Sequence, residues 1–167
     1  SGNGDRVAIG AFKNDDGGID SGHIQIFEYT YSLQEWTLLG EPIPGSMPGE
    51  HFGTSVSLST DGTRVSAGAP QNNVNGEASG QVRIYEYSID ESIIWKIVGS
   101  AISGIAREEL GSSISLSENG RRLAVGAGRH TLSSSSVQVG ALYVYEEMDG
   151  VWYLIGNEIY GTNSRDY

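Results

Sequence analysis

The sequence reads Phe52-Gly53-Thr54-Ser55-Val56-Ser57-Leu58-Ser59 at one point, and returns as Leu110-Gly111-Ser112-Ser113-Ile114-Ser115-Leu116-Ser117. The step, 110 − 52, is 58 residues. Gly-Ala pairs at 10–11, 68–69 and 126–127 keep the same step, since 68 − 10 and 126 − 68 are both 58. Self-similarity at a fixed period indicates stacked units, each unable to bury its apolar faces alone.

Each unit continues with a glycine, alternating apolar residues and an aromatic–acid pair. This pattern reads GHIQIFE at 22–28, GQVRIYE at 80–86 and GALYVYE at 140–146. The units therefore span residues 1–51, 52–109 and 110–167. The first lacks its opening Phe-Gly segment, because residues 3–7 align with 61–65. We expect the chain to be a window cut from a longer protein, with an upstream segment supplying that strand.

The second unit predicts four strands. Residues 54–58 alternate polar and apolar, and Asp61-Gly62 provides the positive φ angles of a tight hairpin. We therefore predict positive φ at Gly62 and at its equivalent, Gly120. Strands are expected at 64–69, 81–87 and 93–98, with a polar loop at 70–79 and a connection at 99–109. In the third strand Val82 and Ile84 share one face, and Tyr85 and Tyr87 share the other.

A sheet with apolar residues on both faces fits between two similar sheets. Helical periodicity is missing, so the chain is predicted to be all-β. Four short strands per unit, repeated radially, are typical of β-propeller blades. We therefore predict about three four-stranded antiparallel blades that form part of a larger ring, and the alternative is a stacked β-solenoid.

Composition restricts the classes of partner. The net charge is −11, and a surface of this sign repels phosphate backbones and anionic lipid headgroups. We therefore expect neither nucleic-acid binding nor direct membrane binding by this chain. There is no Cys, hence no disulfide or thiolate chemistry.

The unit resembles the FG-GAP repeat, the blade of the integrin α-subunit propeller. The dipeptide of that name is Phe52-Gly53, with Leu110-Gly111 in the next unit, and the tripeptide is Gly68-Ala69-Pro70. The resemblance covers the whole chain in three units in register. It implies a propeller and an extracellular or cell-surface role in adhesion or surface architecture.

One feature departs from that family, in which many members bind Ca²⁺ in the hairpin between the first two strands. Here the two hairpins, 59–63 and 117–121, contain one acid each, Asp61 and Glu118. Calcium takes six to eight oxygen ligands, which so few acids do not supply. The usual calcium site is therefore expected to be absent.

The densest acidic loop is a separate candidate for a metal. Carboxylates of Asp16 and Asp20, together with Asn14, could surround one Ca²⁺ near two glycines. The alternative is a solvated turn, because Asn, Asp and Gly tolerate left-handed backbone. The equivalent loops at 70–79 and 128–139 carry fewer acids, so we predict at most one weak Ca²⁺ site per chain and no other cofactor.

Other recurring residues favour structural roles. Glutamates at 28, 86 and 146 recur at one strand position, and arginines at 6, 64 and 122 are natural partners for them. Tryptophans at 36, 95 and 152 suggest packing between blades or on the outer rim, with sugar stacking as the alternative. The histidines at 23, 51 and 130 occupy unrelated repeat positions. The run Ser133–Ser136 is a candidate for O-glycosylation or a flexible loop.

These patterns lead to a functional hypothesis. We predict a non-enzymatic extracellular module for adhesion or structural protein–protein interaction, with its binding surface on the loops at 12–21, 70–79 and 128–139. Expected partners are other propeller blades or protein copies, and an extracellular protein or glycan ligand. A carbohydrate- or calcium-dependent recognition module is the alternative, and a propeller hydrolase or lyase ranks third.

Overall fold

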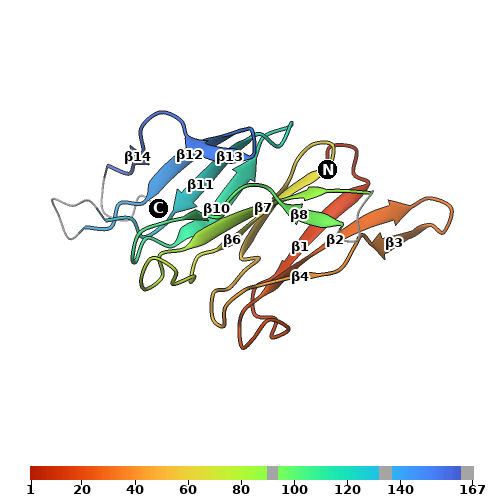
Figure 1. The fold of residues 1–167 in the computed structure, drawn as a ribbon, viewed down its shortest axis with the longest axis horizontal. Helices are drawn as coiled ribbons and strands as arrows, with labels where there is room; N and C mark the ends of the chain where they lie inside the picture. The colour runs from red at the N-terminus through yellow and green to blue at the C-terminus, as the bar shows by residue number, and fades with distance from the viewer. Residues whose placement is uncertain (90–93, 132–136, 163–167) are drawn as a thin grey trace.

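The computed structural model describes residues 1–89, 94–131 and 137–162. In these residues the chain is all-β and forms three antiparallel sheets, none of which closes on itself. The described part contains no helix that could span a membrane. The three sheets follow one another along the chain and lie side by side, from red through green to blue in Figure 1.

The first sheet has one position fewer than the other two. Its strand β1 pairs with β2, and both β3 and β4 pair with the opposite edge of β2. Two short strands, β3 and β4, therefore share the outer position of this sheet, on the same edge of β2. The bounds are β1 (Arg6–Ala11), β2 (His23–Thr30), β3 (Glu35–Leu38) and β4 (Ile43–Pro44).

The second and third sheets are copies of each other and carry the additional strand. Their orders are β5-β6-β7-β8, with β9 also on β7, and β10-β11-β12-β13, with β14 also on β12. The second sheet contains β5 (Ser55–Leu58), β6 (Arg64–Ala69), β7 (Gln81–Tyr87), β8 (Trp95–Ile97) and β9 (Ile102–Ser103). The third contains β10 (Leu110–Leu116), β11 (Arg122–Ala127), β12 (Ala141–Met148), β13 (Val151–Leu154) and β14 (Ile159–Tyr160).

The outer edge differs from the sequence prediction. The expected strand at 93–98 is shorter, because β8 covers only Trp95–Ile97, and residue 93 lies outside the described residues. The expected connection at 99–109 contains β9, where Val82 pairs with Ile102. The chain leaves the edge of β7 after Ile97 and returns to it at Ile102, so one outer strand appears as two.

The hairpins confirm the prediction of positive φ. Gly62 has φ 68° and Gly120 has φ 67°, in the left-handed region that favours glycine. The Asp61 carboxylate accepts hydrogen bonds from the Ser59 hydroxyl and from the amide and hydroxyl of Thr63. Burial acts to raise the pKa of Asp61, but these bonds outweigh it and lower that pKa. The side chain thus closes its own turn.

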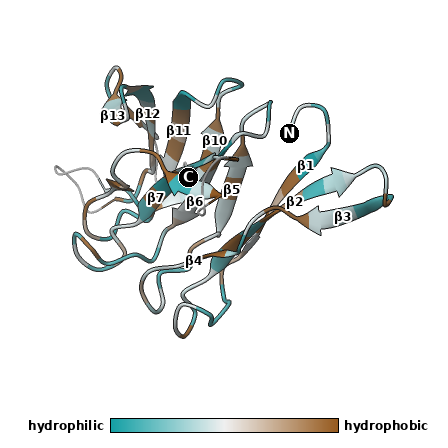
Figure 2. Cartoon of the chain, turned by 45° about the vertical axis from the view of Figure 1, so that its right-hand side comes forward, coloured by the Kyte–Doolittle hydropathy of each residue, from teal (hydrophilic) through white to brown (hydrophobic). Residues whose placement is uncertain are grey.

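The sheets stack on one another, as the apolar residues on both faces predict, and the faces that meet are unlike. The aliphatic face of the first sheet, with Ile24 and Ile26, packs against the aromatic side chains of the second, including Tyr85, Tyr87 and Trp95. Val82 and Ile84 of the second sheet pack in the same way towards Tyr143 and Tyr145 of the third. Brown apolar segments follow the strands in Figure 2. We call these contacts the first junction and the second junction.

Glycines allow the sheets to approach at each junction. A Cβ placed on Gly10 would lie 2.0 Å from the carbonyl oxygen of Gly53, and one on Gly68 would lie 2.1 Å from that of Gly111. Isolated parallel bridges join Gly22 to Phe52 and Gly80 to Leu110. The apolar–Gly pairs at 52–53 and 110–111 therefore each contact two glycines of the preceding unit.

Candidate functional site

The recurring Arg–Glu pairs lie at the end of the sheets that carries the hairpins at 59–63 and 117–121. We call this the hairpin end. The pairs predicted from the sequence form, with shortest N–O distances of 2.8 Å for Arg6–Glu28, 3.0 Å for Arg64–Glu86 and 2.8 Å for Arg122–Glu146. Arg6 also donates to the carbonyl of Gly62, and Arg64 donates to that of Gly120. Each of these two arginines therefore binds the hairpin of the next unit, a structural role.

A further acid joins this cluster at the second junction. Glu147 is buried, and its carboxylate accepts a bond from the Gly150 amide at 2.7 Å and from Arg64 at 3.0 Å. The Gly150 amide, and then Arg64, lower the pKa of Glu147. This residue was not predicted from the sequence, because it lies one position after the recurring Glu146.

Two buried glutamates recur at the opposite, loop end of the sheets. Glu50 and Glu108 are separated by one repeat and are almost completely buried. Each carboxylate accepts a hydrogen bond from the backbone amide of a residue that follows a glycine. The donor to Glu50 is Ser46, which follows Gly45, and the donor to Glu108 is Ile105, which follows Gly104. A Cβ on either glycine would come within 3 Å of the carboxylate. Neither glutamate was predicted from the sequence, although their spacing of 58 was a usable signal.

Glu50 is neutralised by a fixed cation from the next sheet. Arg83 donates to Glu50 at 2.6 Å and to the Ser46 hydroxyl at 2.7 Å, and the Asn72 amide donates to the same carboxylate. The Arg83 guanidinium also lies 4.8 Å from the centre of the Phe52 ring. Burial alone would raise the pKa of Glu50, but Arg83 and the other donors outweigh it and lower that pKa.

Glu108 has different partners at the same positions. His130 stands where the preceding unit has Asn72, and its Nδ1 lies 2.8 Å from the carboxylate. Tyr143 stands where that unit has Arg83, and its hydroxyl donates to Glu108. Tyr160 stacks on His130 with ring centres 5.0 Å apart. Burial and then the bond to Glu108 raise the pKa of Tyr143 well above its usual range.

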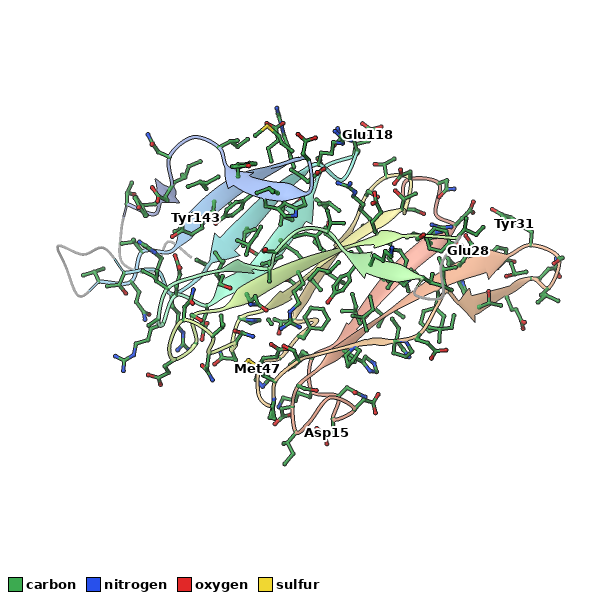
Figure 3. All side chains as sticks on the ribbon, in the orientation of Figure 1. Asp15, Glu28, Tyr31, Met47, Glu118 and Tyr143 are labelled. Carbon is green, nitrogen blue, oxygen red and sulfur yellow. The ribbon has the colours of Figure 1, made fainter. Side chains whose placement is uncertain are left out.

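A cavity of about 290 Å³ lies beside Glu108. His130, Tyr143 and Tyr145 line it, and burial raises the pKa of Tyr145 to about 12. Both tyrosines are therefore neutral at physiological pH and serve as hydrogen-bonding and apolar surfaces. Figure 3 shows Tyr143 on the third sheet, away from the hairpin end marked by Glu118.

The predicted metal loop forms a compact turn in which its side chains bond to its own backbone. The Asn14 side chain accepts from the amide of Asp16 at 2.8 Å, and the Asp15 carboxylate accepts from the amide of Asp20 at 2.8 Å. Asp16 lies 3.3 Å from His23 on β2. No group of three or more acidic or metal-binding side chains suited to an ion occurs in the described residues. The metal at Asn14, Asp16 and Asp20 stays a prediction.

The other predicted loops meet at this end of the molecule. Gln71 donates to Glu109 at 2.7 Å, and Arg129 lies 3.3 Å from the same carboxylate. An exposed pair joins Arg107 to Glu77. The loop at 128–139 is described only in part, and Ser133–Ser136 lies outside the described residues. Figure 3 places Asp15 and Met47 at this end, opposite Tyr31 and Glu28.

The tryptophans have two different environments. Trp95 is 6% exposed and donates to the carbonyl of Leu39 in the preceding sheet at 2.8 Å. Trp152 donates to the carbonyl of Val98 at 3.1 Å. These two confirm the prediction of packing between units. Trp36 is 47% exposed, because the face of the first sheet on which it lies packs against no other described sheet.

The comparisons with known proteins leave the chain without a demonstrated family. A scan against protein-family models finds no match, and no curated protein matches the sequence. The assignment of function therefore depends on the geometry described above.

Proposed function

We propose that the three sheets are consecutive blades of a larger β-propeller of the FG-GAP type. Three observations support this proposal: the strand order in each sheet, the outer strand broken at one place in each, and the unlike faces that pack at both junctions. Head-to-tail packing of unlike faces leaves a complementary face at each end of the array. Such an array closes only when further units complete a ring.

We further propose that the chain is a non-enzymatic extracellular module for adhesion or structural protein–protein interaction. The loop end carries the binding surface. The observation that carries this proposal is a set of exposed apolar side chains among polar neighbours on these loops: Phe12, Ile19, Val74, Ile105 and Val137. Apolar groups surrounded by polar residues are typical of protein interaction sites.

The placement of the acids supports a role without catalysis. The buried glutamates 50, 108 and 147 each accept bonds from a neighbouring sheet. These carboxylates stabilise the junctions, so the scaffold stays rigid while the loops differ between units. A rigid scaffold with variable loops is a common arrangement for recognition. The extracellular location is inferred from the resemblance to FG-GAP repeats.

A binding assay with matched variants tests this proposal. The chain is immobilised and probed with a panel of purified extracellular-matrix proteins. Replacing Ile19 and Ile105 by serine should weaken binding about tenfold or more, as expected when anchor residues are truncated. The control replaces Leu33 and Ile89, which are equally exposed at the hairpin end, and should bind as the wild type does. Equal losses in both variants would reject the loop end as the binding surface.

A calcium- or glycan-dependent recognition module is the second candidate. The exposed Asp16 carboxylate and its neighbours Asn14 and Asp20 favour it. Binding to a glycan array with and without chelator separates this candidate from the first. We expect added Ca²⁺ to raise the melting temperature little, because stabilisation grows only as RT ln(1 + [L]/Kd) and a site with few carboxylates has a large Kd. Two or more tight sites in calorimetric titration would contradict this expectation.

A further inference from the structure

The cavity at the second junction lies beside the buried carboxylate that corresponds to Glu50 of the first. Its volume, about 290 Å³, is close to the lower end of the range for ligand pockets. Ile105 and Glu108 of the second unit line it, together with Tyr143 and Tyr160 of the third. The cavity is therefore formed by the stacking of two described sheets.

The first junction shows what fills the equivalent place there. The Arg83 guanidinium donates to Glu50 at 2.6 Å and lies 4.8 Å from the centre of the Phe52 ring. The second junction has Tyr143 in place of Arg83 and Leu110 in place of Phe52. Tyrosine carries no cation and leucine has no ring, so the second carboxylate borders a cavity and not a guanidinium.

Glu108 can accept a further donor. It accepts bonds from the Ile105 amide and the Tyr143 hydroxyl, and it contacts Nδ1 of His130. A carboxylate offers about four lone-pair sites, so one of them remains. Within the described residues His130 is the one ion-pair partner of Glu108, and a histidine is not a permanent cation. The buried charge is therefore compensated less fully than that of Glu50.

The rest of the lining suits a planar cation. Tyr143, Tyr145 and Tyr160 contribute aromatic rings, which attract cations. Glu158 adds a second carboxylate, which is exposed. A guanidinium is planar, stacks on aromatic rings and donates two parallel bonds to a carboxylate, whereas an ammonium is a compact and more strongly hydrated charge. The lining therefore favours a guanidinium.

We propose that the cavity beside Glu108 binds a guanidinium group carried on a short flexible chain. The group donates to Glu108 as Arg83 does to Glu50, and its chain leaves beside the exposed Glu158. The source is a free alkylguanidine or an arginine side chain of another polypeptide. This inference rests on the second junction and not on the exposed apolar side chains of the loops, so it and the proposed adhesion function can fail separately.

Titration with probes of one shape and different charge tests the proposal. N-butylguanidine, which is cationic, and N-butylurea, its neutral analogue, are added to the unmodified chain at constant ionic strength. We expect the backbone amide resonance of Ile105, which bonds to Glu108, to shift to saturation. The dissociation constant of the guanidine should be at least about tenfold lower, because hydrogen bonds to charged groups are the stronger ones. Equal affinity for the two probes would overturn the proposal, and tighter binding of n-butylammonium would overturn the choice of a guanidinium.

A blocked amino acid separates the two sources of the group. N-acetyl-arginine amide carries the same guanidinium on a chain that ends in peptide groups. Tighter binding than that of N-butylguanidine would assign an arginine side chain, because the peptide groups then add contacts. Weaker binding would assign a free alkylguanidine.

A substitution that restores the cation of the repeat tests the position of the site. Tyr143→Arg places a guanidinium where the preceding unit has Arg83, so it should bind Glu108 from within the chain. We expect the affinity for N-butylguanidine to fall at least about tenfold, since the site is then occupied. Unchanged binding by this variant would overturn the proposal.

A second variant leaves every donor of Glu108 in place, and it decides the question if Tyr143→Arg does not fold. Glu158→Gln should weaken binding of N-butylguanidine about threefold, as expected for an exposed ion pair. Glu118→Gln is the matched control, because it makes the same change of charge at the exposed hairpin end and should bind as the wild type does. Equal losses in the two variants would show attraction by the net charge alone and would overturn the proposal.

Discussion

The two junctions use the same glutamate position with different partners. At the first junction Glu50 is held by Arg83, a permanent cation, and by Asn72. At the second, Glu108 is held by Tyr143 and His130. The backbone donor after the glycine is common to both. The comparison shows that the carboxylate and its loop belong to the repeat, whereas the group that compensates its burial varies.

The physical consequence is a difference in how each junction depends on single residues. A buried carboxylate paired with a buried cation is costly to leave without its partner. A carboxylate that accepts a bond from an uncharged hydroxyl, as Glu108 does from Tyr143, loses less when that donor is removed. We therefore expect the first junction to be more sensitive to substitution than the second.

The largest effect is expected at the tryptophan of the first junction. Trp95→Ala should destabilise the fold by about 3–5 kcal/mol, because it removes a buried ring and its bond to Leu39. Trp36→Ala is the matched control, and it should cost less than about 1 kcal/mol because the ring is half exposed. Denaturant melts measure both. Equal losses would show that burial at the junction does not set the cost.

Removal of the buried cation is expected to rank next. Arg83→Met keeps much of the side-chain volume but leaves Glu50 without its charge partner, and should cost about 3 kcal/mol. The free energy of unfolding from denaturant melts at pH 7 is the measurement. Arg107→Met is the control, since its pair with Glu77 is exposed, and surface pairs contribute about 0–1 kcal/mol. A loss below about 1 kcal/mol for Arg83→Met would remove the asymmetry between the junctions.

The equivalent change at the second junction should be smaller. Tyr143→Phe removes one donor from Glu108 but leaves His130 and the amide of Ile105, so we expect a loss of about 1–2 kcal/mol. Tyr31→Phe serves as the control. Its hydroxyl also donates to a carboxylate, that of Asp5, but on the surface, and stability should not change. A Tyr143→Phe variant less stable than Arg83→Met would reverse the proposed order.

Several parts of this molecule could be predicted from the sequence. The repeat positions of the strands, the positive φ of Gly62 and Gly120, and the pairing of recurring arginines with recurring glutamates all follow from local patterns. These features depend on strand periodicity, on turn chemistry and on residues at one register position, each of which the sequence displays directly.

The contacts around the buried glutamates could not be predicted in the same way. Asn72 and His130 are equivalent by position but differ in chemistry, and Arg83 and Tyr143 differ in charge. Their relation appears only when two sheets are stacked and both side chains reach one carboxylate. The short strand β9 was missed for a related reason, since two residues carry too little alternation to be recognised. Long-range packing decides both features.

The smallest effect is expected in the dependence of stability on pH. The pKa of Glu50 is lower in the folded chain than its ordinary value of 4.5. Ionised Glu50 therefore stabilises the fold above that value, and this stabilisation is lost as the pH falls through the folded-state pKa. The free energy of unfolding, measured from pH 6 down to pH 3, should fall more steeply for the wild type than for Glu50→Gln, which has no proton to bind. Parallel slopes for wild type and Glu50→Gln would mean that Arg83 does not hold the carboxylate ionised.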